Sequence, residues 1–99
     1  MKINLEDQQG KISVDVEGDI DDFTYSLLVN EIDNLMLVGS KKIAINLEKC
    51  HYISFSCIKY LVDKKKNLSK NGAFLDVVMN DGEEKELFDL MVTYNESIL

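Results

Sequence analysis

The sequence predicts an α/β domain with helices packed on a mixed β-sheet, in the element order ββαβαβα with at most one further strand. Two short segments of alternating polar and apolar residues flank a glycine turn, which is typical of a β-hairpin. After the hairpin, segments with helical spacing of apolar residues alternate with short apolar runs. Because this alternation favours strands covered by helices, residues 1–99 are expected to form a single domain.

The first half of the chain supplies the hairpin and one helix. Residues 2–6 form the first strand, residues 8–10 the turn, and the second strand carries on one face Ile12, Val14 and Val16. An acidic loop at 18–22 precedes a helix whose apolar residues recur at helical spacing, namely Tyr25, Leu28, Val29, Ile32, Leu35 and Met36. Thr24 or Asp22 is expected to cap the start of this helix, and Gly39 to end it.

The second half supplies two strands and two helices. Residues 42–47 predict a strand, and the following helix turns inward Ile58, Leu61, Val62 and Leu68 before it ends at residues 71–72. The apolar run 73–79 predicts a central strand. Two acidic residues then begin a third helix whose predicted core residues are Leu87, Leu90 and Met91. Residues 93–99 are expected to supply at most a short last strand.

Charge and cysteine content exclude several classes of function. The net charge of −7 argues against nucleic-acid binding. Eight of the eleven basic residues, all lysines, lie between Lys41 and Lys70. No apolar run approaches the ~20 residues that a membrane span needs, and the N-terminus becomes acidic before a signal-like stretch forms. We therefore expect a cytoplasmic protein without membrane insertion, in which Cys50 and Cys57 stay reduced.

Catalytic and metal sites are hard to assemble from this sequence. The spacing of Cys50, His51 and Cys57 fits no usual zinc pattern, so we expect no metal and no cofactor. The acidic residues at 19–22 lack the rest of a calcium loop and predict a solvated loop. A hydrolase that uses Ser56 or Cys57 would depend on His51, the only histidine, as its base. We predict no catalytic residue.

Several motifs, in order, resemble those of a known family. The loop Gly18-Asp19-Ile20-Asp21-Asp22-Phe23-Thr24 resembles the glycine–acid–hydrophobic–aspartate–x–x–threonine loop of STAS domains, the family of bacterial anti-sigma factor antagonists. Residues 43–47 resemble the family's central strand, and residues 50–61 its strand-to-helix switch segment. Residues 71–75 and 86–90 resemble the glycine-then-strand segment and the third helix. The resemblance spans essentially the whole chain.

The sequence departs from the family at the switch itself. Family members typically carry Asp-Ser-Ser-Gly at the helix start, and a kinase that is also the anti-sigma factor phosphorylates the first serine. By spacing, Ser54 stands for the aspartate and Phe55 for that serine, while Ser56 and Cys57 stand for the second serine and the glycine. Lys59 replaces a residue that is usually small. Because Phe55 has no hydroxyl, the usual switch cannot operate at that position.

Three outcomes remain open for this segment. Ser56 or Ser54 is the alternative site of phosphorylation, although the side-chain direction at a helix start differs by about 100° from one residue to the next. Phe55 is either an exposed anchor of a constitutive interface or an ordinary core residue. The third outcome is that the scaffold serves another purpose. At least one of the two serines is expected to cap the helix.

The resemblance implies a non-enzymatic interaction domain that binds a kinase-type anti-sigma factor or a related signalling protein. The partner-binding residues it implies are Asp19, Asp21, Asp22, Thr24, Ser54, Phe55, Ser56, Cys57 and Lys59. The alternative function is a small cytosolic accessory subunit of an ABC transporter. STAS domains often close with another helix, for which this sequence has no residues, so an exposed apolar strip is expected to favour homodimerisation or partner docking.

Overall fold

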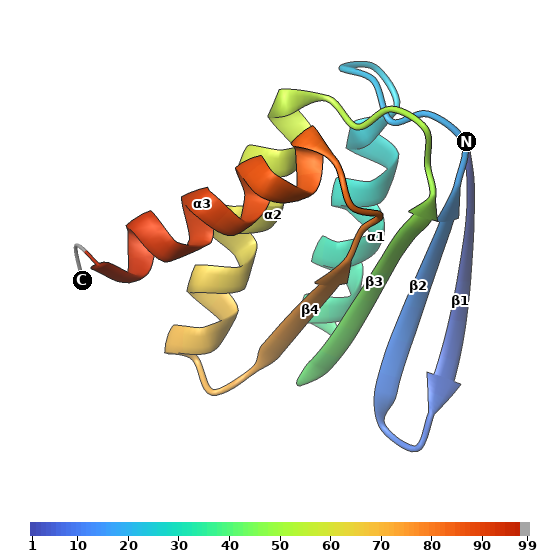
Figure 1. Ribbon diagram of the computed structural model, residues 1–99. Coiled ribbons are helices and arrows are strands. Elements are labelled where there is room, and N and C mark those ends of the chain that lie inside the picture. The colour runs from blue at the N-terminus through green and yellow to red at the C-terminus, as the bar shows by residue number, and fades with distance from the viewer. Residues whose placement is uncertain (98–99) are drawn as a thin grey trace.

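Among the described residues, four strands form one mixed sheet, the first two helices pack on one of its faces, and the third helix packs against the second (Figure 1). The computed structural model describes residues 1–97 of the chain, with side chains for residues 1–94. In chain order the elements are β1 Lys2–Gln8, β2 Lys11–Glu17, α1 Tyr25–Leu37, β3 Lys42–Lys49, α2 Phe55–Lys70, β4 Phe74–Val78 and α3 Glu83–Ser97. The predicted α/β class and the order ββαβαβα are confirmed.

The sheet has the strand order β1-β2-β3-β4. β1 and β2 pair as the predicted antiparallel hairpin, whereas β2 with β3 and β3 with β4 are parallel. Side chains that alternate along the strands face the helices and are buried, including Val14, Val16, Ile43, Ile45, Leu47 and Leu75. The domain core therefore lies between this sheet face and the helices, as strand alternation predicts.

The strand β4 lies at the edge of the sheet, so the prediction of a central strand is wrong. Its one strand neighbour is β3, and Leu75 faces the core. On alternate positions Phe74, Asp76 and Val78 are exposed. An apolar run therefore does not by itself distinguish a central strand from an edge strand with one covered face.

The helix α3 differs from its prediction at both its core and its end. Phe88 is buried, whereas Leu90, which was expected in the core, is 67% exposed. Leu87 and Met91 are half-buried against the core. The helix continues to Ser97, so the expected last strand is wrong for residues 93–97, and residues 98–99 lie outside the described residues.

Two glycines end helices as predicted. Gly39 has φ +84° and follows α1, and the N–H of Ser40 donates to the carbonyl of Leu35 at 3.0 Å. Gly72 has φ +74° and follows α2, and the N–H of Ala73 donates to the carbonyl of Leu68 at 2.8 Å. Both are positions where a residue with a Cβ would be strained.

Side chains of α1 and α2 connect the two helices. The Tyr60 hydroxyl donates to Oδ1 of Asp33 at 3.0 Å, and Nζ of Lys64 lies 3.1 Å from the same oxygen. Both helices begin at the same end of the sheet (Figure 1). No helix among the described residues is both long and apolar enough to span a bilayer.

Candidate partner-binding site

The loop before α1 is fixed by Asp21 and Thr24. Oδ1 of Asp21 accepts hydrogen bonds from the N–H groups of Phe23 at 2.9 Å and Thr24 at 2.8 Å, and from the Thr24 hydroxyl at 3.0 Å. In return, Oγ1 of Thr24 accepts from the N–H of Asp21 at 2.9 Å. Donation from the Thr24 N–H is the main cause that lowers the pKa of the Asp21 carboxyl.

The cap of α1 is therefore different from the one expected. Thr24 precedes the first helical residue but makes no side-chain capping hydrogen bond, and Asp22 is exposed. Asp21 holds the turn that leads into the helix, and its carbonyl accepts from the N–H of Tyr25 at 3.0 Å. Thus the aspartate and threonine of the loop motif shape the backbone. All three loop acids are exposed, and of these the side chains of Asp19 and Asp22 do not take part in the turn that Asp21 holds.

At the start of α2, Ser54 has the capping role that was expected of at least one serine. Its backbone is extended, and its hydroxyl oxygen accepts from the N–H of Cys57 at 3.2 Å. The Ser54 residue is only 1% exposed, whereas Ser56 is exposed. A kinase would have to unwind the helix start to reach the Ser54 hydroxyl, and it would not have to do so for Ser56.

Backbone hydrogen bonds join the loop to the segment before α2. The N–H of Ile20 donates to the carbonyl of Tyr52 at 2.8 Å, and the N–H of Ser54 donates to the carbonyl of Ile20 at 2.7 Å. Ile20 and Ile53 thereby form an isolated parallel bridge, and both are buried. The structure thus brings together the two segments from which the predicted partner-binding residues come.

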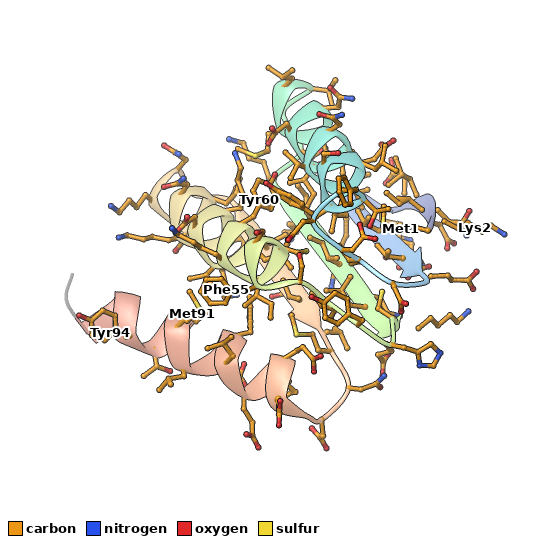
Figure 2. All side chains as sticks on the ribbon, turned by 90° about the horizontal axis from the view of Figure 1, so that it is seen from above. Met1, Lys2, Phe55, Tyr60, Met91 and Tyr94 are labelled. Carbon is orange, nitrogen blue, oxygen red and sulfur yellow. The ribbon has the colours of Figure 1, made fainter. Side chains whose placement is uncertain are left out.

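Three exposed members of this set, Phe55, Ser56 and Lys59, lie in the first turns of α2. Phe55 is 58% exposed, which favours the exposed alternative over core packing. Lys59, one turn later, lies on the same side of the helix, and Ser56 is turned from Phe55 by about 100°. In Figure 2 Phe55 lies on the side of α2 that faces α3, and Tyr60 lies on the side of α1. An aromatic side chain so exposed is typical of a contact surface.

Two apolar residues of this end of the molecule were missed by the sequence analysis. Phe23 is 88% exposed in the loop, and Leu27 is exposed one turn later in α1. Leu27 falls out of phase with the buried residues Leu28 and Ile32 of α1, and this phase difference marks it as a surface residue. Phe23 lies in the turn before the helix, so helical periodicity does not place it.

Cys57 lies in the core, although it was predicted to contact a partner. It is fully buried, and burial is the main cause that raises the pKa of its thiol to about 12. Burial, followed by the negative charge of Asp19, raises the pKa of the Cys50 thiol to about 11. Because the thiolate is the reactive form, neither cysteine is poised as a nucleophile near neutral pH. Cys57 and Ser54 support the surface from below.

A polar cleft of about 180 Å³ lies where β3 and β4 end, and His51 lines it together with Cys50, Asp81 and Glu84. Ser56 and Cys57 are absent from its described lining, so the cleft does not bring the hydrolase residues together. Among the described residues, no three histidine, cysteine or acidic side chains are placed to hold a metal ion.

Comparisons with known proteins show the fold. No protein-family model and no curated protein matches the sequence. An anti-sigma factor antagonist from Mycobacterium paratuberculosis superposes with a TM-score of 0.81 at 21% identity, over 96% of this chain and 80% of that chain. The unphosphorylated anti-sigma factor antagonist SpoIIAA superposes with a TM-score of 0.66 at 15% identity, over 90% of this chain and 96% of that chain.

A third structure, that of the larger protein Mglu, gives a TM-score of 0.65 at 16% identity, over 81% of this chain but 19% of that one. The same arrangement of strands and helices thus occurs alone and within a longer chain. Identities this low establish the fold and leave the activity to be argued from the site. The chain has the STAS-like fold of the anti-sigma factor antagonists.

Proposed function

We propose that this chain is a non-enzymatic interaction domain that acts like an anti-sigma factor antagonist in the cytoplasm. Its partner would be a kinase-type anti-sigma factor or a related signalling protein. The partner contacts the exposed residues of the start of α2 and the loop before α1, namely Phe55, Ser56, Lys59, Asp19, Asp22 and Phe23. Because Phe55 occupies the first position of α2, phosphorylation at this position does not regulate binding.

The exposed side chain of Phe55 is the observation that carries this proposal. It occupies the first residue of α2, 58% exposed, at the position aligned by spacing with the phosphorylated serine. A phosphate there would add a charge of roughly −1.5 to −2, which is how such a site disrupts docking. Phe55 cannot take that charge, and large exposed aromatic side chains are frequent anchors of interfaces. The interface is therefore constitutive, because phosphorylation at this position cannot disrupt it.

The arrangement below this surface supports a rigid site. Ser54 caps α2 from a buried position, and Asp21 with Thr24 holds the loop. The hydrogen bonds of Ile20 to Tyr52 and Ser54 keep the two segments in register. A surface held in this way loses little conformational entropy when a partner binds.

Affinity capture from a lysate of the native organism tests the proposal. The bait is the tagged wild-type chain, compared with Phe55→Asp and the control Tyr94→Asp. Asp at the first position of α2 is favourable to the helix, so Phe55→Asp is expected to remain folded. Tyr94 is 63% exposed on α3, away from the proposed surface, so its variant controls for the loss of an exposed aromatic.

We expect wild type and Tyr94→Asp to capture the same kinase-type anti-sigma factor, identified by mass spectrometry, and Phe55→Asp to lose it. Equal capture by all three variants would contradict the proposed surface. Capture of transporter subunits in place of an anti-sigma factor would assign the chain to the accessory-subunit alternative.

A further inference from the structure

A groove of about 290 Å³ lies between the second half of α2, the edge strand β4 and α3, and Phe55 is not part of its lining. β4 and α3 diverge from the connection at residues 79–82, and α2 runs behind the gap that they leave (Figure 1). The walls include the apolar side chains of Val62, Ala73, Phe74, Leu75 and Val92.

The rim of the groove is basic, in contrast to the chain as a whole. Lys65, Lys66 and Lys70 line it with Ser69, and the one acidic residue of the lining is Asp76. The whole chain carries a net charge of −7. An anion is therefore repelled by most of the surface and attracted to this rim.

The three lysines of the rim differ in their bonding. Nζ of Lys65 donates to the carbonyl of Leu75 at 2.7 Å, so this ammonium group is fixed to the edge strand. Lys64, outside the groove, pairs with Asp33. Among the described residues no acidic side chain pairs with Lys66 or Lys70. Their ammonium groups are thus available to an anion from outside.

We propose that this groove binds a free anionic amphiphile of the fatty-acid type. Its aliphatic tail contacts Val62, Leu75 and Val92, and its carboxylate lies between Lys66 and Lys70. The volume of about 290 Å³ lies at the lower end of the range for small-molecule clefts, which begins at about 300 Å³, and this suits a ligand with a single short tail. A concave groove of this size encloses a single tail, whereas a membrane surface would need a broad exposed face.

The groove is separate from the proposed partner site. Phe55 is not part of the groove lining, and along the axis of α2 it lies about 10 Å from Val62 and about 21 Å from Ser69. The inference therefore stands on its own, and its failure would leave the proposed function untouched.

Decanoate below its micelle concentration is the probe, with acetate and decyltrimethylammonium as controls. Acetate has the charge without the tail, and the ammonium compound has the tail with the opposite charge. Titration calorimetry and amide chemical shifts measure binding to the wild-type chain. We expect saturable binding of decanoate alone, with shifts concentrated at Val62, Ala73, Leu75 and Val92.

Two variants test the residues. Lys66→Glu with Lys70→Glu is expected to weaken decanoate binding roughly tenfold, about 1.4 kcal/mol. The matched control, Lys2→Glu with Lys41→Glu, changes the net charge equally with exposed lysines outside the groove and is expected to bind as wild type. Ser69→Trp places a large side chain into the groove from an exposed helix position and is expected to abolish binding.

Three results would overturn the proposal. They are equal binding of decanoate and decyltrimethylammonium, binding that Ser69→Trp leaves intact, and chemical shifts that map elsewhere. Binding to phosphatidylglycerol vesicles without saturable binding of decanoate would replace the free amphiphile by a membrane surface.

Discussion

The N–H of Ser54 donates a 2.7 Å hydrogen bond to the carbonyl of Ile20, and this bond joins the loop before α1 to the start of α2. Its neighbour runs from the N–H of Ile20 to the carbonyl of Tyr52. The loop thus pairs with the segment that leads into α2 as a short parallel bridge. The position of Phe55 at the surface depends on residues more than thirty positions earlier in the chain.

Asp21 is expected to stabilise the fold through the turn that it holds. Asp21→Asn removes a charged acceptor that receives three hydrogen bonds, so thermal unfolding should begin at a lower temperature than in wild type. Asp22→Asn is the control, because the exposed Asp22 side chain makes no hydrogen bond with the described residues. An equal effect of both substitutions would show that general charge, and not the turn, is responsible.

The comparison of wild type with Asp21→Asn also predicts how the stability of the fold depends on pH. The folded pKa of Asp21 is lowered below its ordinary value of 3.8, so its contribution is complete above that pH and is lost as the pH falls through the lower folded value. The stability advantage of wild type over Asp21→Asn should therefore persist at pH 5 to 7 and vanish in stronger acid. Denaturant unfolding at several pH values measures the advantage, and an advantage that does not decline as the pH falls below 3.8 would contradict the assignment.

The two serines of the switch segment should respond differently to alanine. Ser54→Ala removes the cap of α2 and leaves the buried N–H of Cys57 without its acceptor, at a cost of about 1 kcal/mol. In a domain of this size that lowers the melting temperature by about 4–8 °C. Ser56→Ala, at an exposed position, should change stability by less than about 0.5 kcal/mol. Calorimetry measures the melting temperature of both variants, and equal losses of stability would refute the capping role of Ser54.

Tyr60 is expected to stabilise the contact between α1 and α2. Tyr60→Phe loses the hydrogen bond to Asp33 and should cost about 1 kcal/mol, whereas the exposed Tyr94→Phe should cost nothing measurable. Burial is the first cause that raises the pKa of Tyr60, so its contribution is complete below the ordinary pKa of 10 and is lost as the pH rises through the folded value. Unfolding curves above pH 10 should show the advantage of wild type declining, and a constant advantage would contradict this.

Periodicity was enough to predict most of the fold. The hairpin alternates strictly, and α1 carries a clear apolar stripe bounded by Gly39, so element type and order followed from local pattern. In α3 the residues 87–92 are almost continuously apolar, and periodicity cannot select one face. The packing against α2 selects Phe88 and leaves Leu90 exposed. Which face of α3 is buried therefore depends on tertiary packing and cannot be derived from the sequence of this helix alone.

The site was predictable to a lesser degree. Spacing identified the loop and the start of α2 but did not separate supporting residues from exposed ones. The cap formed by Ser54 sets the phase of α2 and turns Cys57 inward, while Phe55 faces outward. Among the three loop acids, only the hydrogen bonds of Asp21 single it out from Asp19 and Asp22. Such choices depend on backbone geometry that a sequence pattern does not resolve.

The most direct test of phosphate-independent binding is the dissociation constant of the captured anti-sigma factor with wild type and with Phe55→Ser. Each is measured before and after incubation with that kinase and ATP, with intact mass as the record of phosphorylation. We expect wild type to gain no phosphate and keep its affinity, and Phe55→Ser to gain one and bind at least roughly tenfold more weakly. Phosphorylation of wild type at Ser56 or Ser54 with a matching loss of affinity would contradict the account.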